Sequence, residues 1–284
     1  MEEIDFNITI VGLGLIGGSF AMALRELNPR NLWGVDKDLD ALKFAEKKGI
    51  IDCGYLDPKI PLNKSDIVII CLYPNTTIEF IKNNIINFKD GAVITDTAGI
   101  KEILINEVNT FLPDNIDFIG GHPMAGGECK GIHNASKDIF NGANYILTPT
   151  ERNKLENILM IERIAKLIGC KNVVHVTPKE HDEIIAYTSH LPHVLAAALI
   201  TSDINVNTNL FVGGSFNDAT RVAKINTDLW LELILENKEN ILNKISLFER
   251  NISNIKNAIE LGNKEELATI LNTGSLKKEI LLKS

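Results

Sequence analysis

A glycine-rich turn near the amino terminus is the first feature of the chain that could do chemistry. The segment GLGLIGG has the spacing G-x-G-x-x-G, with glycines at Gly12, Gly14 and Gly17. The turn follows a predicted strand and opens a predicted helix, whose free N–H groups would stabilise a ligand phosphate. The motif alone is weak, but in this context it predicts a dinucleotide site.

An acidic residue supports the same site. Asp36 ends the second predicted strand, about 20 residues after the turn, where a carboxylate accepts hydrogen bonds from ribose hydroxyls and repels a 2′-phosphate. We therefore expect NAD rather than NADP, although the neighbouring Lys37 weakens the exclusion. The residues expected to contact the cofactor are Gly12, Leu13, Gly14, Leu15, Ile16, Gly17, Asp36, Leu72, Tyr73 and Pro74.

A histidine in IGGHPMAGGECKGI is the second chemical feature. His122 follows a predicted strand, at the edge of the sheet where ligands bind in open α/β folds. Glycines flank it on both sides and leave room for a ligand. A lone histidine is more often structural, but this setting favours a functional role.

Strand-like and helical patterns alternate in the first part of the chain, and the later part is helical. Short apolar stretches alternate with helical ones up to about residue 150, which predicts a parallel, doubly wound sheet of α/β class. The predicted strands cover residues 6–12, 31–36, 66–74, 91–99, 117–123, 143–149 and 172–178. Beyond these the pattern is helical, over 181–202 and 229–260. We expect an NAD-binding Rossmann domain at 1–165 and an all-helical domain at 166–284.

Bulk properties exclude several classes of protein. The formal net charge is −8 over 284 residues, so nucleic acid and anionic membranes are poor partners. The four cysteines form no C-x-x-C pair, which is typical of reduced thiols in a cytoplasmic protein. Residues 184–200 are apolar but contain two histidines and a proline, and we expect a buried helix rather than a membrane span. No metal site is expected.

The ordered motifs resemble a known family. GLGLIGGS, TDTAGIK, GGHPMAGGECKGI, SHLPH, DATR and DLW, spread over about residues 6–245, look like those of the prephenate dehydrogenase family, which includes arogenate and cyclohexadienyl dehydrogenases. The resemblance implies a Rossmann domain followed by a helical dimerisation domain, and hence a homodimer. It also implies NAD-dependent oxidative decarboxylation of prephenate to 4-hydroxyphenylpyruvate, a step of tyrosine biosynthesis.

The same resemblance assigns roles to single residues. His122 matches the catalytic histidine, and Arg221 matches an arginine that binds a substrate carboxylate. His193 would face the pyruvyl side chain, and Glu128 would lie near the site mouth. His190 and His181 are expected to be structural.

Two residues differ from the family pattern, and three alternative functions stay open. Gly99 stands where many relatives have a serine that bonds the catalytic histidine, so either Thr97 or a water would replace it or His122 would be oriented less tightly; Asn217 stands where some have lysine. The substrate could be arogenate. A hydroxyacid dehydrogenase would use a lysine, of which Lys224 is the nearest candidate, and a non-catalytic NAD-binding regulator would need neither His122 nor Arg221.

Overall fold

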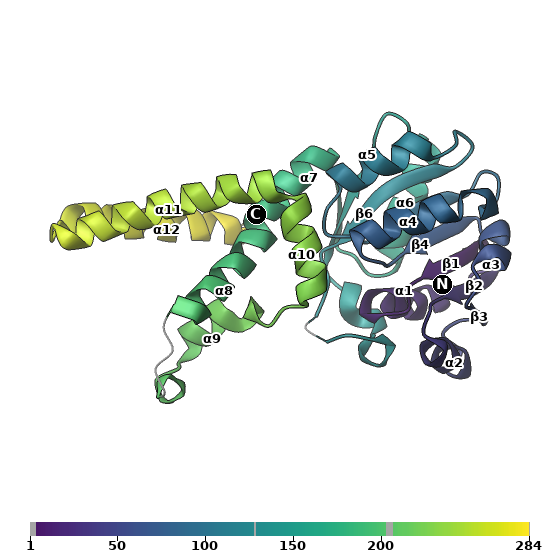
Figure 1. Cartoon of the computed structure of the whole chain (residues 1–284), viewed down its shortest axis with the longest axis horizontal. Coiled ribbons are helices and arrows are strands. Elements are labelled where there is room, and N and C mark those ends of the chain that lie inside the picture. The colour runs from purple at the N-terminus through teal and green to yellow at the C-terminus, as the bar shows by residue number, and fades with distance from the viewer. Residues whose placement is uncertain (1–3, 128, 203–206, 284) are drawn as a thin grey trace. The chain divides into compact units, whose positions relative to one another are not determined.

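An eight-stranded sheet is built from residues 7–175 of the computed structural model, which describes residues 4–127, 129–202 and 207–283 (Figure 1). The strand order is β3-β2-β1-β4-β5-β6-β7-β8. The order reverses between β1 and β4, and ligands bind at such a switch point in open α/β sheets. The strands are β1 Asn7–Val11, β2 Asn31–Val35, β3 Cys53–Tyr55, β4 Ile67–Ile70, β5 Val93–Asp96, β6 Asp117–Pro123, β7 Asn144–Thr148 and β8 Asn172–His175.

Helices cover both faces of the sheet, as the prediction of a doubly wound α/β fold required. One apolar core joins the sheet to α1, α2 and α6, and a second joins it to α3, α4 and α5. The central strand β4 reads IVII and is buried throughout, because both of its faces are covered. These helices are α1 Leu15–Arg25, α2 Leu39–Lys47, α3 Lys59–Lys64, α4 Pro74–Asn83, α5 Glu102–Phe111 and α6 Leu155–Leu167.

The sheet is parallel as predicted except at one strand pair. β7 pairs with β6 in antiparallel register, with His122 opposite Ile146, while the other strand pairs are parallel. The physical reason is the connection, which contains only the short turns η2 Ile132–Asn134 and η3 Lys137–Phe140 instead of a crossover helix. Gly18 of α1 packs against this connection, near Ala135 and Ile132.

Helices dominate the remainder of the chain. The predicted helix over 229–260 is divided at Asn237 into α10 and α11. A π-helical turn, η4 Ala186–His190, and a 3-10 turn, η6 Arg221–Ala223, interrupt the others. The helices are α7 Pro178–Ile185, α8 Leu191–Ser202, α9 Gly214–Thr220, α10 Thr227–Glu236, α11 Lys238–Glu260 and α12 Lys264–Lys283.

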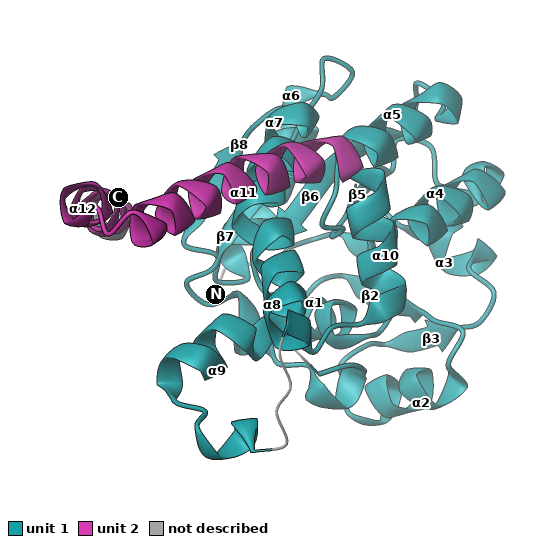
Figure 2. Ribbon diagram, turned by 60° about the vertical axis from the view of Figure 1, so that its left-hand side comes forward, with its two compact units in different colours: residues 1–237 teal, residues 238–284 magenta. Residues whose placement is uncertain are grey.

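The chain divides into two compact units, residues 1–237 and 238–284, coloured separately in Figure 2. The second unit is a hairpin of α11 and α12. This division follows Asn237, and the domain boundary at residue 165 stays a prediction.

One helical stretch is apolar enough to cross a membrane by length and composition alone. It spans Pro178–Ser202, and only 28% of its most apolar window is buried in the single chain. The stretch is therefore less buried than the sequence led us to expect. Core helices of proteins that do not enter membranes pass the same test, so this finding is weak evidence for a span.

Candidate active site

The glycine-rich turn has the shape that a dinucleotide needs. Gly12 has a φ of +88°, and a Cβ there would lie 2.7 Å from the carbonyl oxygen of Cys71. A Cβ on Gly17 would lie 1.8 Å from the carbonyl oxygen of Gly12, so helix α1 could not start so close to β1. A Cβ on Gly14 would meet nothing within 4 Å, which leaves the N-terminus of α1 open to a phosphate.

The carboxylate of Asp36 faces this turn from the end of β2. One oxygen accepts a hydrogen bond from the backbone N–H of Leu13 at 2.6 Å, and the other accepts one from Asp38 at 2.9 Å. A carboxylate has about four acceptor positions, so Asp36 retains capacity for a ribose hydroxyl. The predicted residues Leu15 and Ile16 begin α1, beside the same turn.

The predicted residues Leu72, Tyr73 and Pro74 form the loop across the switch point. Leu72 packs over Gly12, and Pro74 occupies the first turn of α4, where its missing N–H costs nothing. The Tyr73 hydroxyl accepts a hydrogen bond from the side-chain amide of Asn226, which caps α10. Helix α10 therefore begins beside the predicted cofactor loop.

A line of three side chains lies at the end of β6. His122 is half-buried, and its Nδ1 lies 2.9 Å from Nε2 of His181 on α7. Nδ1 of His181 lies 2.7 Å from Oδ1 of Asp182, and both of these residues are buried. The three groups form a continuous hydrogen-bonded relay.

The carboxylate of Asp182 fixes the direction of this relay. It accepts hydrogen bonds from the backbone N–H groups of Lys101 and Glu102, at 2.8 and 2.9 Å, where α5 begins. An ionised carboxylate only accepts, so Nδ1 of His181 donates to it and Nε2 of His181 is the acceptor. His122 then donates through Nδ1, and its Nε2 keeps a lone pair for an incoming proton.

Burial keeps the site histidines neutral. Desolvation, followed by the neighbouring His181, Lys101 and His190, holds the pKa of His122 well below its ordinary value. Burial also lowers the pKa of His181, and it lowers that of His190 to about 4. A neutral imidazole can accept a proton, so His122 has the electrical state that a general base requires.

A buried ion pair supports the backbone around His122. Lys101 and Asp96 are fully buried and bonded to each other, and burial lowers the pKa of Lys101. Asp96 also accepts hydrogen bonds from the backbone N–H of Gly121 at 3.1 Å and of Ala98 at 2.8 Å. Removing one partner would leave a buried charge without compensation.

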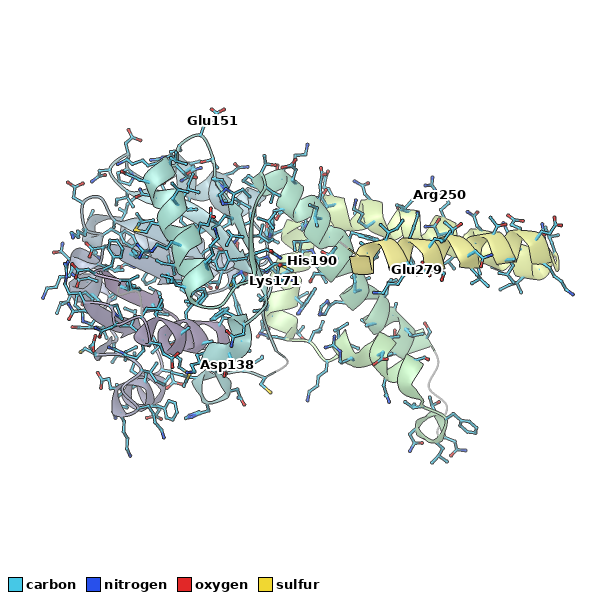
Figure 3. All side chains as sticks on the ribbon, turned by 180° about the vertical axis from the view of Figure 1, so that it is seen from behind. Asp138, Glu151, Lys171, His190, Arg250 and Glu279 are labelled. Carbon is cyan, nitrogen blue, oxygen red and sulfur yellow. The ribbon has the colours of Figure 1, made fainter. Side chains whose placement is uncertain are left out.

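A π-helical turn sets the position of His190. The N–H of Leu191 bonds to the carbonyl oxygen of Ala186, five residues back, and Pro192 has no N–H to continue the α-helical pattern. The widened turn places buried His190 against the edge of Trp230 and within 3.2 Å of the Asn237 amide. Figure 3 shows His190 among neighbouring side chains, whereas Glu151 points outward from its loop.

Arg221 lies near enough to His193 for its charge to act on the imidazole. His193 stacks on Trp230, and η6, which begins at Arg221, packs against α8. Burial lowers the pKa of His193, the Ser189 carbonyl partly opposes this, and the charge of Arg221 lowers the pKa further. Arg221 is exposed. Glu128 lies outside the described residues.

Helix α10 joins these two groups of residues. Its N-terminal Asn226 contacts the cofactor loop, and Glu232 accepts a hydrogen bond from the backbone N–H of Asn75 at 3.1 Å. The same helix carries Trp230, against which His190 and His193 pack. Helix α10 thus contacts the loop that follows β4 and also carries the indole against which His190 and His193 pack.

Sequence reasoning missed the relay. His181 was expected to be structural, and Thr97 or a water was expected to bond His122 in place of the absent serine. In the structure His181 is the partner of His122, while Thr97 faces the Cys71 thiol. The adjacent pair His181–Asp182 was the available signal, since a neighbouring carboxylate commonly orients a functional histidine.

Comparison with known proteins agrees with this arrangement. Residues 20–174 match the family described as prephenate dehydrogenase, nucleotide-binding domain. Residues 177–273 match the one described as prephenate dehydrogenase, dimerization domain. Together these matches extend over most of the chain, from the first helix to the last.

Individual relatives are similar to this chain over 70% or more of their own lengths. A prephenate dehydrogenase of Lactococcus lactis is 33% identical over 88% of this chain and 70% of its own. A cyclohexadienyl dehydrogenase of Zymomonas mobilis is 30% identical over 89% of this chain and 88% of its own. The crystal structure of prephenate dehydrogenase from Aquifex aeolicus in complex with hydroxyphenyl propionate and NAD+ is 29% identical in sequence. It matches this chain with a TM-score of 0.88 and covers 99% of this chain and 98% of its own.

Proposed function

The chain belongs to the prephenate dehydrogenase family, and from this premise we propose that it oxidises prephenate to 4-hydroxyphenylpyruvate and carbon dioxide with NAD as the hydride acceptor. The observation that carries the proposal is the fixed orientation of His122. Its Nε2 is left as an acceptor at the carboxyl edge of the sheet, in the same compact unit as the glycine-rich turn.

The residues at the switch point fit NAD. The turn is open at Gly14, and the N-terminus of α1 supplies N–H groups for the pyrophosphate. Asp36 would accept from a ribose hydroxyl and disfavour a 2′-phosphate. When bound, the nicotinamide accepts the hydride; the chain supplies the remaining steps. The crystallised Aquifex relative, solved with NAD+, supports this assignment.

His122 would act first as a base and then as an acid. Its Nε2 accepts the proton of the ring hydroxyl while the carbon that bears this hydroxyl loses hydride to the cofactor. The ring carboxylate then leaves as carbon dioxide, and the bonding electrons make the ring aromatic and place negative charge on the former hydroxyl oxygen. The proton on His122 returns to that oxygen, so the imidazole is neutral again after each turnover.

Arg221 and His193 would hold the substrate. Prephenate carries two carboxylates, and a guanidinium can bind one of them through two parallel hydrogen bonds. The acidic chain has no general field to attract such a dianion, so a local cation is required. Glu128 remains a candidate for the site mouth by resemblance.

The choice between prephenate and arogenate depends on one functional group. The two differ by a keto or an amino group, and relatives named for prephenate and for cyclohexadienyl substrates are about equally similar to this chain. A non-catalytic NAD-binding regulator is a weaker candidate, because it has no use for a relay that prepares a general base.

We further propose a homodimer that works in the cytoplasm. The second family match is described as a dimerization domain. Large apolar side chains on α12 are exposed in the single chain, including Leu271, Leu276 and Ile280, and a second copy would cover them. Light scattering after size exclusion should give twice the mass of the chain.

One assay separates the candidate functions. The protein is mixed with NAD and either prephenate or arogenate, and absorbance of the reduced cofactor is followed. Turnover of prephenate at a kcat/KM above that of arogenate supports the proposal. A preference for arogenate assigns the other substrate, and binding of NAD without turnover of either compound indicates a regulator.

A further inference from the structure

We propose that His181 is a positioning residue for the reaction, which holds His122 in its productive tautomer through the contact between Nδ1 of His122 and Nε2 of His181. The inference rests on the proposed function. It assigns to a residue of α7 the task that a serine performs in many relatives.

The position of that serine carries no side chain in this chain, because residue 99 is glycine. A Cβ on Gly99 would lie 3.9 Å from Cε1 of His122, so the position does face the catalytic ring. The same Cβ would lie only 3.3 Å from Cδ2 of Leu233 on α10. Leu233 is buried, so a side chain at position 99 would require its Cδ2 to shift by a few tenths of an ångström.

His181 contacts His122 from helix α7. The two rings are 5.1 Å apart between centroids and meet at 60°, edge to face, with one hydrogen bond between them. Nδ1 of His181 is committed to Asp182, which is itself held by the first N–H groups of α5. The orientation of His122 is therefore set by a chain of bonds that ends in the backbone of a helix.

A purely structural role for His181 makes a different demand. In that case only its bond to Asp182 matters, because it holds the carboxylate that accepts hydrogen bonds from the backbone N–H groups of Lys101 and Glu102 at the start of α5. Substitution of His181 by asparagine or by glutamine separates the structural role from the positioning role. The side-chain amide of asparagine matches the position of Nδ1 and can keep the bond to Asp182, whereas that of glutamine extends to the position of Nε2 and can keep the bond to His122.

The test compares His181→Asn with His181→Gln in the whole protein. We expect His181→Asn to lower kcat about 10²-fold, since His122 loses the acceptor that fixes its tautomer. His181→Gln should stay within about tenfold of wild type, because its amide oxygen can accept from Nδ1 of His122. KM should change less than kcat in both variants.

A second histidine supplies the control. His175 on β8 pairs with Glu162 at 3.1 Å on the surface, and His175→Gln should leave kcat at the wild-type value. The melting temperature of each variant tells loss of folding from loss of positioning.

Two results would overturn the inference. One is a wild-type kcat in a folded His181→Asn protein; the other is an equal loss of kcat in both variants. Failure of the proposed function would look different, because wild type itself would then turn over neither prephenate nor arogenate.

Discussion

His193 lies flat on the indole of Trp230, with ring centroids 3.8 Å apart and an angle of 29° between the ring planes. Nδ1 of His193 donates to the carbonyl oxygen of Ser189 at 2.8 Å. The stack fixes the plane of the imidazole and the hydrogen bond fixes its rotation, so Nε2 is the nitrogen left for a substrate.

Removing the aromatic face should weaken substrate binding. An aromatic pair contributes about 0.5–1.5 kcal/mol beyond burial, so Trp230→Leu should raise KM for prephenate about 2–10-fold. Trp230→Phe keeps a ring under His193 and should change KM less. Steady-state kinetics of the two variants decide this; equal KM values in both would mean that the stack does not orient His193.

Arg221 should contribute mainly to substrate binding. A hydrogen bond to a charged group contributes about 1.5–3 kcal/mol, so Arg221→Ala should raise KM roughly 10–150-fold with a smaller change in kcat. Arg163→Ala, on the outer surface of α6, is the matched control and should leave KM unchanged. An unaltered KM in Arg221→Ala would remove this residue from the substrate site.

Activity should persist into mildly acidic solution. The reaction needs neutral His122, and burial together with His181, Lys101 and His190 lowers its pKa, so the active form survives below pH 6.5. A histidine with the ordinary pKa would lose about three-quarters of its neutral form by pH 6. We expect kcat/KM at pH 6 to remain within about twofold of its value at neutral pH. An imidazole with the ordinary pKa loses about threefold of its neutral form between pH 7 and pH 6, so a loss of about threefold or more would show that the pKa is not lowered.

Asp36 should determine the choice of cofactor. Asp36→Ala removes the carboxylate that repels a 2′-phosphate, so the ratio of kcat/KM for NAD over NADP should fall at least about tenfold. The same change removes the acceptor for the Leu13 amide and should raise KM for NAD. If wild type already prefers NADP, the role given to Asp36 is wrong.

The sequence allowed the sheet and the nucleotide turn to be predicted because both depend on local patterns. Gly12, Gly14 and Gly17 fall between a strand and a helix, and the structure gives the first and last of them contacts that only glycine tolerates. The antiparallel β7 was missed because strand periodicity carries no direction, and only the short connection after β6 determines it.

The relay was harder to foresee because it depends on contacts between distant residues. His122 and His181 are 59 positions apart, and no periodicity links them. The space beside Gly99 is narrowed by Leu233, which comes from yet another helix. Predictions about which side chains of a site touch one another need the packing of the elements, and the sequence alone did not supply it.

The most direct test of the account is the kcat of His122→Asn. Asparagine keeps a polar side chain at the end of β6 but cannot take the hydroxyl proton, so kcat should fall by about 10²–10⁴ while the affinity for NAD, titrated separately, stays within about twofold. A folded His122→Asn protein with near-normal kcat would contradict the central claim that this imidazole is the base.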